Sequence, residues 1–294
     1  MDNSLRGIAL IVGATMLFSI SDAIAKLLGQ DLPAVEIGVF RYIIFVAMAA
    51  VFCAHAKIRP WRVAVPGAQI WRGLGLVLSA LCFIEALRHM PLADAASVGF
   101  VSPLLITALS VPMLGEVVGI RRWTAVAVGF LGVLIVMRPG TGAFQIESLW
   151  VLGSSSSWAL ASVLTRQMAG KDNAATTLLW SSAVGLIVVT LMLPFVWVVP
   201  TVRDLWLCAA LGVIASSGQF LLVQAYRHAE ATTLAPFSYV QLAWSVSLGY
   251  LLWGTLPDAW TWVGAAVIVA SGIYTVHRER VRSRERQLAA PAAV

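Results

Sequence analysis

Charged residues are scarce in this chain of 294 residues, since Asp, Glu, Lys and Arg together make up only 12% of it. A water-soluble domain carries about 25% charged residues. The hydrophobic share is 60%, with a mean hydropathy of +0.86. A water-soluble fold of this size could not bury so much apolar surface. The composition therefore predicts a protein that crosses the membrane several times.

Cysteine is rare as well, and the three that occur, Cys53, Cys82 and Cys208, lie within apolar runs. An odd number in such surroundings argues against a disulfide framework and indicates small apolar side chains. The first apolar run contains Asp22 and Lys26 and lacks a small-residue cleavage site, so it is not a cleavable signal peptide.

Several motifs that carry chemistry are missing. There is no G-x-x-x-x-G-K-[ST] loop, so we expect no ATP-driven pump within this chain. The four histidines do not have the spacing of a metal site, and no nucleophile, base and acid form a catalytic pattern. The sequence therefore predicts no enzyme activity, no cofactor and no bound metal.

The excess positive charge, +6 in total, does not predict nucleic-acid binding. Five arginines lie at 278–286, and most other basic residues fall in short stretches between apolar runs. A basic segment next to a membrane helix favours contact with anionic lipid. The partner that this charge predicts is the lipid bilayer.

What the sequence does contain is apolar runs of about 20 residues, the length that spans a bilayer as a helix. The expected fold class is an all-α integral membrane protein with ten transmembrane helices. The predicted spans are 7–28, 33–54, 69–90, 92–114, 120–137, 147–169, 174–198, 204–228, 232–253 and 258–277.

The chain also repeats itself, because residues 86–138 match residues 225–277 at an offset of 139, and the first spans match at an offset of 140. The predicted units are a first repeat at 1–140, a second repeat at 141–280 and a basic cytoplasmic tail at 281–294. Matched positions are Ala86 with Ala225, Arg88 with Arg227, His89 with His228, Gly115 with Gly254, Trp123 with Trp262, Gly13 with Gly153 and Lys26 with Arg166.

An odd number of spans per repeat means that the second repeat enters the membrane from the opposite side. Such inverted repeats underlie many secondary transporters, in which the two repeats rock about a site near the bilayer midplane. If the N-terminus is cytoplasmic, fourteen Lys and Arg residues lie inside and four outside. Positive residues favour the inner side, so both termini are expected in the cytoplasm.

Short motifs carry a family resemblance that covers nearly the whole chain. Ala86, Leu87 and Pro91 form an A-L-x-x-x-P break, Ser102-Pro103 lies within a span, and Gly115-Glu116 precedes a span with Trp and Gly. With the ten spans, these features resemble the EamA domain of the drug/metabolite transporter superfamily. The second repeat departs from the pattern at Leu242 and Thr255, where the first has Pro and Glu.

This resemblance implies a bacterial inner-membrane carrier of small metabolites, similar to amino-acid exporters, that works by alternating access. One alternative is an uptake carrier for a vitamin-like or cationic metabolite, because the pattern of Asp22, Lys26, Pro33, Glu36 and Arg41 also occurs in such relatives. A membrane sensor or an intramembrane enzyme is a further alternative. An enzyme would need a catalytic constellation, and none is visible. A sensor would need an output domain, and the 17 residues after His277 are too few to form one.

Ionisable residues within spans are candidates for function because they are costly in lipid. Asp22, Arg41 and Glu85 each lie about 8–12 Å below the predicted outer surface, at 1.5 Å per residue. We expect them in one cluster at the outer end of a central cavity. The alternative is local pairing of Asp22 with Lys26 and of Glu85 with His89.

Aromatic and amide side chains complete the predicted substrate site: Phe18, Phe83, Phe100, Trp158, Trp180, Gln219, Tyr239, Gln241 and Trp244. For each aromatic the alternative is a position facing lipid or the core. Pro103 and Pro236 remove backbone donors and are predicted gating residues, with a simple kink as the alternative. Small residues in the spans at 120–137 and 258–277 permit either internal packing or a homodimer contact.

Overall fold

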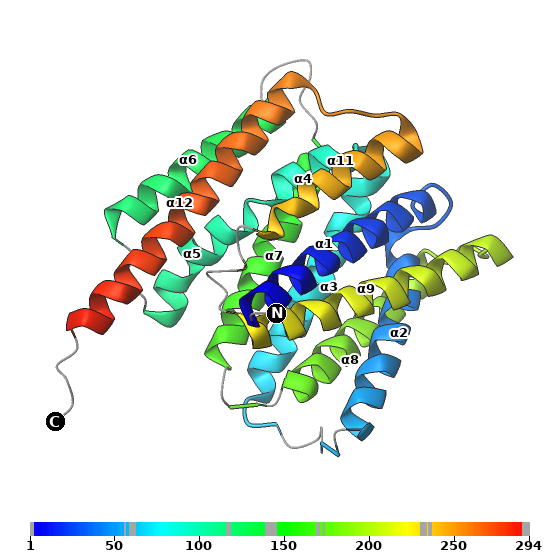
Figure 1. The fold of residues 1–294 in the computed structure, drawn as a ribbon. Coiled ribbons are helices and arrows are strands. Elements are labelled where there is room, and N and C mark those ends of the chain that lie inside the picture. The colour runs from blue at the N-terminus through cyan, green and yellow to red at the C-terminus, as the bar shows by residue number, and fades with distance from the viewer. Residues whose placement is uncertain are drawn as a thin grey trace.

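The computed structural model of the protein describes residues 3–55, 57–58, 63–115, 119–138, 146–168, 171–172, 174–229, 234 and 237–289. All the regular structure in these ranges is helical (Figure 1). The helices are α1 Asn3–Leu28, α2 Ala34–His55, α3 Pro66–His89, α4 Leu92–Gly99, α5 Ser102–Leu114, α6 Ile120–Met137, α7 Ser148–Gln167, α8 Ala174–Met192, η1 Leu193–Phe195, α9 Val202–His228, α11 Val240–Trp253 and α12 Ala259–Ala289.

Six helical stretches of the described chain are long and apolar enough to cross a membrane. Shorter apolar stretches lie in α6, α11 and α12. α7 is less apolar because it carries four consecutive serines at 154–157. α1 and α2 run in opposite directions, so the bundle has two ends (Figure 1). We call the one where α1 stops the Leu28 end and the one where α2 stops the His55 end.

The predicted span at 92–114 is confirmed as one stretch that is long and apolar enough to cross a membrane, and a short break at Phe100 and Val101 divides it into α4 and α5. The break has a local cause in Pro103, which lacks a backbone N–H and is tolerated in the first turn of a helix. Pro103 occupies that turn of α5. The other predicted gating residue, Pro236, lies outside the described residues.

The predicted span at 174–198 is too long. α8 ends at Met192, and a single 3-10 turn follows before the chain leaves the helical path. Pro194 and Pro200 cannot continue a helical ladder, which explains the early end. The freed backbone finds another partner, because the Val198 N–H donates to Glu36 Oε2 at 3.1 Å.

Helices far apart in the sequence form the main packing pairs. α1 packs against α9, α3 against α7, α2 against α8, and α6 against α12. The α6–α12 pair lies at one edge of the bundle and contacts the rest mainly through α4 and α5 (Figure 1). Small residues allow close approach, since Gly132 and Gly264 face each other across this pair.

Candidate substrate site

A polar seam runs along the contact between α1 and α11. The Ser19 hydroxyl donates to the Gln241 carbonyl at 3.3 Å and lies 3.3 Å from the Ser245 hydroxyl. Ser19 and Ser245 are fully buried. Asp22 and Lys26 follow Ser19 at spacings of three and four residues, which places all three on one face of α1. The sequence therefore directs a polar stripe of α1 toward α11.

Asp22 brings three helices together. Its carboxyl group interacts with the side-chain amide of Gln241 on α11 and with the positive charge of Arg41 on α2. Asp22, Arg41 and Gln241 were each predicted from the sequence as substrate contacts, and the structure gathers them. A carboxylate, a guanidinium and an amide can together bind groups of either charge, so this trio is the centre of the candidate site.

Arg41 has incomplete polar contacts in this structure. Its Nε is enclosed and has no hydrogen-bond partner. Its guanidinium lies 5.2 Å from the centre of the Phe45 ring, one helical turn away. Within the described chain it forms no hydrogen bond or ion pair. An enclosed donor without a partner costs about 1–3 kcal/mol, so this arrangement is unfavourable unless something else binds there.

Glu85 does not join this trio, and the single cluster of three charges expected from the sequence is wrong in that respect. Its carboxylate lies 2.9 Å from Arg88 and 3.2 Å from His89. Both partners lie on its own helix, at i+3 and i+4, where side chains meet without any tertiary contact. The alternative of local pairing therefore holds for Glu85.

Lys26 does not pair with Asp22 either, but closes the Leu28 end of the bundle. Its ammonium donates to the carbonyls of Leu87 at 2.9 Å and Met90 at 2.6 Å. These carbonyls belong to the last turn of α3, where unpaired acceptors and the helix dipole favour a cation. The Trp253 ring lies 5.6 Å from the same ammonium. The side chain thus ties α1 to α3 and α11.

Arg72 lies within the predicted span at 69–90 but is not among the site residues predicted from the sequence. Arg72 Nε donates to the Thr165 hydroxyl of α7 at 2.6 Å, and its NH1 donates to the Ser181 hydroxyl of α8. It therefore joins three helices toward the His55 end. The signal that could have found it is the same one that selected Arg41, a charge within an apolar run.

The predicted aromatic residues do not form one wall. The rings of Phe100 and Tyr239 are 4.9 Å apart, tilted at 44°, and the Tyr239 hydroxyl lies against Gly272 of α12. Phe18 packs on Gly218 of α9.

The remaining predicted contacts are scattered. Trp158 is 40% exposed on α7, and the enclosed Nε1 of Trp244 has no hydrogen-bond partner within the described chain. Phe83, Trp180 and Gln219 are half-buried on α3, α8 and α9.

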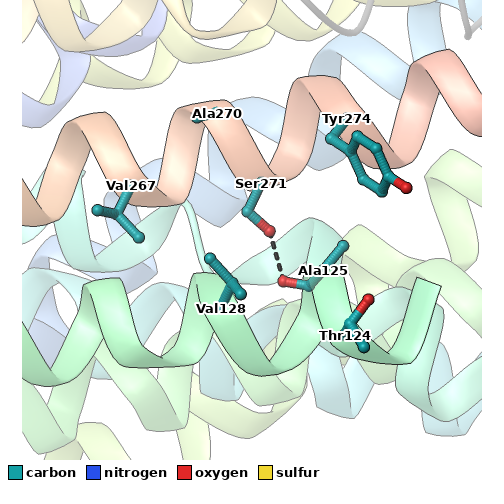
Figure 2. A pocket seen from close by; sticks show the side chains of 7 residues that line it. All are labelled: Thr124, Ala125, Val128, Val267, Ala270, Ser271 and Tyr274. Carbon is teal, nitrogen blue, oxygen red and sulfur yellow. Dashed lines mark hydrogen bonds between the residues drawn. The ribbon is translucent and has the colours of Figure 1, made fainter. Parts of the chain in front are cut away.

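A groove of about 360 Å³ lies elsewhere, between α6 and α12 (Figure 2). Figure 2 shows Ser271 donating to the Ala125 carbonyl across this groove, with Thr124 and Tyr274 at one end. Its lining comes only from the two edge helices, so it is separate from the trio of Asp22, Arg41 and Gln241. In the described ranges, no group of three His, Cys, Asp or Glu could hold a metal ion.

Known proteins identify the family. The model of the EamA-like transporter family matches residues 5–138 and again residues 145–276. This chain belongs to the EamA-like transporter family. The resemblance noted in the sequence is thereby confirmed, and the protein is a multi-pass membrane transporter of small metabolites rather than an enzyme.

The EamA relatives differ in what they carry. The S-adenosylmethionine uptake transporter of Rickettsia prowazekii is 26% identical, over 94% of each chain. The pseudopaline exporter CntI of Pseudomonas aeruginosa is 31% identical over 91% of this chain and 94% of its own. The riboflavin transporter of Vibrio cholerae is 28% identical over 97% of this chain and 98% of its own.

A crystal structure also shares the fold. It superposes with a TM-score of 0.60 at 20% identity, covering 95% of this chain and 97% of its own.

Proposed function

We propose that this EamA transporter is a secondary carrier that moves amino acids, or small metabolites built on an amino-acid group, outward across the bacterial plasma membrane. The observation that carries the proposal is the trio of Asp22, Arg41 and Gln241 on three different helices. A zwitterion needs one acidic and one basic contact, and the surrounding apolar bundle can hold its side chain. A site of this composition is expensive in a membrane and favours a ligand-binding role.

The proposed mechanism is alternating access between two inverted repeats, at 1–140 and 141–280. Pairs of contacts support it. Gly73 of α3 packs on Val184 of α8, and their counterparts at offsets of 139 and 140, Gly212 of α9 and Ile44 of α2, also pack on each other. An inverted repeat with a two-fold axis in the membrane plane would produce such paired contacts.

Helix ends add to this support. Gly115 and Gly254, which are counterparts, both end their helices in the left-handed conformation, with φ of 67° and 65°. Phe100 and Tyr239 are also counterparts, and their rings contact each other directly. In an inverted repeat, a residue that contacts its own counterpart lies near the symmetry axis.

We place both termini in the cytoplasm, because the predicted inner loops hold most of the Lys and Arg residues. The Leu28 end then faces the outside, and the contacts of Lys26 close that side. The α6–α12 pair remains a candidate homodimer contact because it lies at the edge of the bundle (Figure 1).

Uptake of a vitamin-like or cationic metabolite is the second candidate. It is favoured by the relatives named for S-adenosylmethionine uptake and riboflavin transport. The S-adenosylmethionine uptake transporter differs in direction from the exporter of Pseudomonas aeruginosa, so the family alone does not choose between the candidates.

Purified protein in proteoliposomes tests both. The vesicles are loaded with each of the twenty labelled amino acids, with S-adenosylmethionine or with riboflavin, and release is compared with protein-free vesicles. Release of amino acids is expected. No release of any amino acid, together with release of riboflavin, would replace the first candidate by the second. Direction is measured in cells, where overproduction should lower the internal pool of the substrate and raise it in the medium.

A further inference from the structure

Arg41 poses a problem that the helix bundle does not solve by itself. A guanidinium has five N–H donors and keeps its charge under all ordinary conditions. The Arg41 guanidinium makes no hydrogen bond to the described chain, and its Nε is shut off from solvent. Arg72, which also lies within a predicted span, donates instead to Thr165 and Ser181. Of these two arginines, Arg41 is therefore the one whose donors are all unused within the described chain.

Asp22 is an opposite charge that attracts Arg41, but it does not take up these donors. The two groups attract each other, but within the described chain they do not form an ion pair at 4.0 Å or less. Asp22 interacts instead with the Gln241 amide on the far helix. The acid and the base thus face each other from α1 and α2 without direct contact.

We propose that Arg41 binds the carboxylate of the transported metabolite, and that the substrates of this carrier are therefore compounds with a free carboxylate next to an ammonium group. This inference rests on the proposed function and narrows its substrate class. The planar guanidinium matches a carboxylate with two parallel N–H···O bonds, and the Phe45 ring supports its face. Asp22 would accept from the ammonium group of the same molecule.

Charge balance explains why the carboxylate matters. With the site empty, Asp22 and Arg41 offset each other's charge. A bound zwitterion adds one charge of each sign, so the site remains neutral. A decarboxylated amine would add only a positive charge beside Arg41, and like charges in a low-dielectric site repel strongly. The carrier should therefore reject the amine that corresponds to each substrate.

Two matched pairs of labelled probes test this with the full-length protein in proteoliposomes. They are S-adenosylmethionine with decarboxylated S-adenosylmethionine, and L-phenylalanine with phenethylamine. At least one acid should cross about 10-fold faster than its amine, the ratio expected from one charge-assisted contact. Arg41→Gln should reduce the flux of the acid about 10-fold and raise that of the amine, because the charge that repels the amine is gone. Arg41→Lys, which keeps the charge, should retain part of the preference.

The ratio of acid flux to amine flux, measured in one preparation, does not depend on how much of the protein has folded. Arg72→Gln is the matched control, since that arginine is already bonded, and it should leave the ratio unchanged. Equal flux of acid and amine in the parent overturns the inference, as does an unaltered ratio in Arg41→Gln. If only riboflavin crosses, the protein is a carrier but the inference about Arg41 and carboxylates is overturned. No flux of any probe or amino acid overturns the proposed function and the inference with it.

Discussion

Arg41 and Arg72 have opposite surroundings, although both lie within the spans. Arg72 donates to hydroxyl groups on two neighbouring helices and holds those helices together. Arg41 lies over a phenyl ring with its Nε enclosed. Two arginines in similar positions along the sequence therefore have different roles, and the contacts of each side chain show which role it has.

Asp172 is expected to stabilise the His55 end. It accepts from the Ala64 N–H at 2.7 Å and from the Gln69 amide at 2.9 Å. Asp172→Asn removes the charge from these bonds, which are partly open to solvent. We expect a loss of about 1 kcal/mol in the free energy of unfolding at pH 7, measured by thermal unfolding in detergent.

The loss should depend on pH. Partial burial alone would raise the pKa of Asp172, but the hydrogen bonds from Ala64 and Gln69 outweigh it and hold the pKa below its usual value of 3.8. The stabilisation is then present above that value and is lost as the pH falls through the lower pKa of the folded state. The difference between parent and Asp172→Asn should thus vanish in acid. Asp31→Asn is the control, because its ion pair with Arg203 is open to solvent at 3.6 Å. A constant difference at all pH values would contradict the assignment.

The surroundings of some charged residues could be predicted from the sequence better than those of others. The sequence has no acidic residue at i±3 or i±4 of Arg41, and in the structure Arg41 forms no ion pair on its own helix. Glu85 looked equivalent by depth, yet its partners on the same helix take its charge. Depth in the membrane follows from counting residues, whereas the direction of a side chain depends on how the helix is rotated against its neighbours.

At the scale of helices, close packing depends on glycine at a few crossing points. Gly73 is such a point, because a methyl group there would lie 2.7 Å from Val184 Cβ and 3.3 Å from the Ser181 carbonyl. The carbonyl is backbone and cannot easily move. The α3–α8 contact therefore has no room for a larger residue.

Gly73→Ala should lower the free energy of unfolding by about 1–3 kcal/mol, the usual cost of overpacking. Gly67→Ala on the same helix is the control. Nothing lies within 4 Å of the added methyl there, and the change should be neutral or slightly stabilising. Chemical or thermal unfolding in detergent measures both. If the inverted repeat is right, Gly212→Ala will destabilise the protein to a similar degree.

Lys26→Ala should loosen the Leu28 end. The variant leaves the carbonyls of Leu87 and Met90 without their cation. Hydrogen–deuterium exchange should accelerate in the last turns of α1 and α3 and stay unchanged in α6. Lys26→Arg, which can still donate to both carbonyls, should protect these turns as the parent does. Unchanged exchange in Lys26→Ala would show that other contacts close this end.

Apolar run length predicted most helices, but it could not predict their interruptions. The runs at 92–114 and 174–198 are mostly apolar, yet each contains a proline at which the helix stops or restarts. Hydrophobic length reports whether a segment can sit in a membrane. It does not report where the backbone hydrogen bonds are broken, because apolar side chains suit a continuous helix and an interrupted helix equally well.

At the scale of the molecule, we expect both termini to lie in the cytoplasm. Reporter fusions test it. A fluorescent protein at the C-terminus should fluoresce, and alkaline phosphatase there should be inactive, if both termini are cytoplasmic. Phosphatase fused after Gln30, at the Leu28 end, should be active. Active phosphatase at the C-terminus would reverse the proposed orientation of the whole bundle.

The contact between the rings of Phe100 and Tyr239 has a consequence for the ancestry of this protein. If the two repeats descend from one duplicated gene, the ancestral half made this contact with a second copy of itself, inserted upside down. An aromatic residue at that position was then its own partner, and a single mutation changed both sides of the contact. Fusion of the copies freed the two positions to diverge, and today they differ by one hydroxyl, which lies against Gly272.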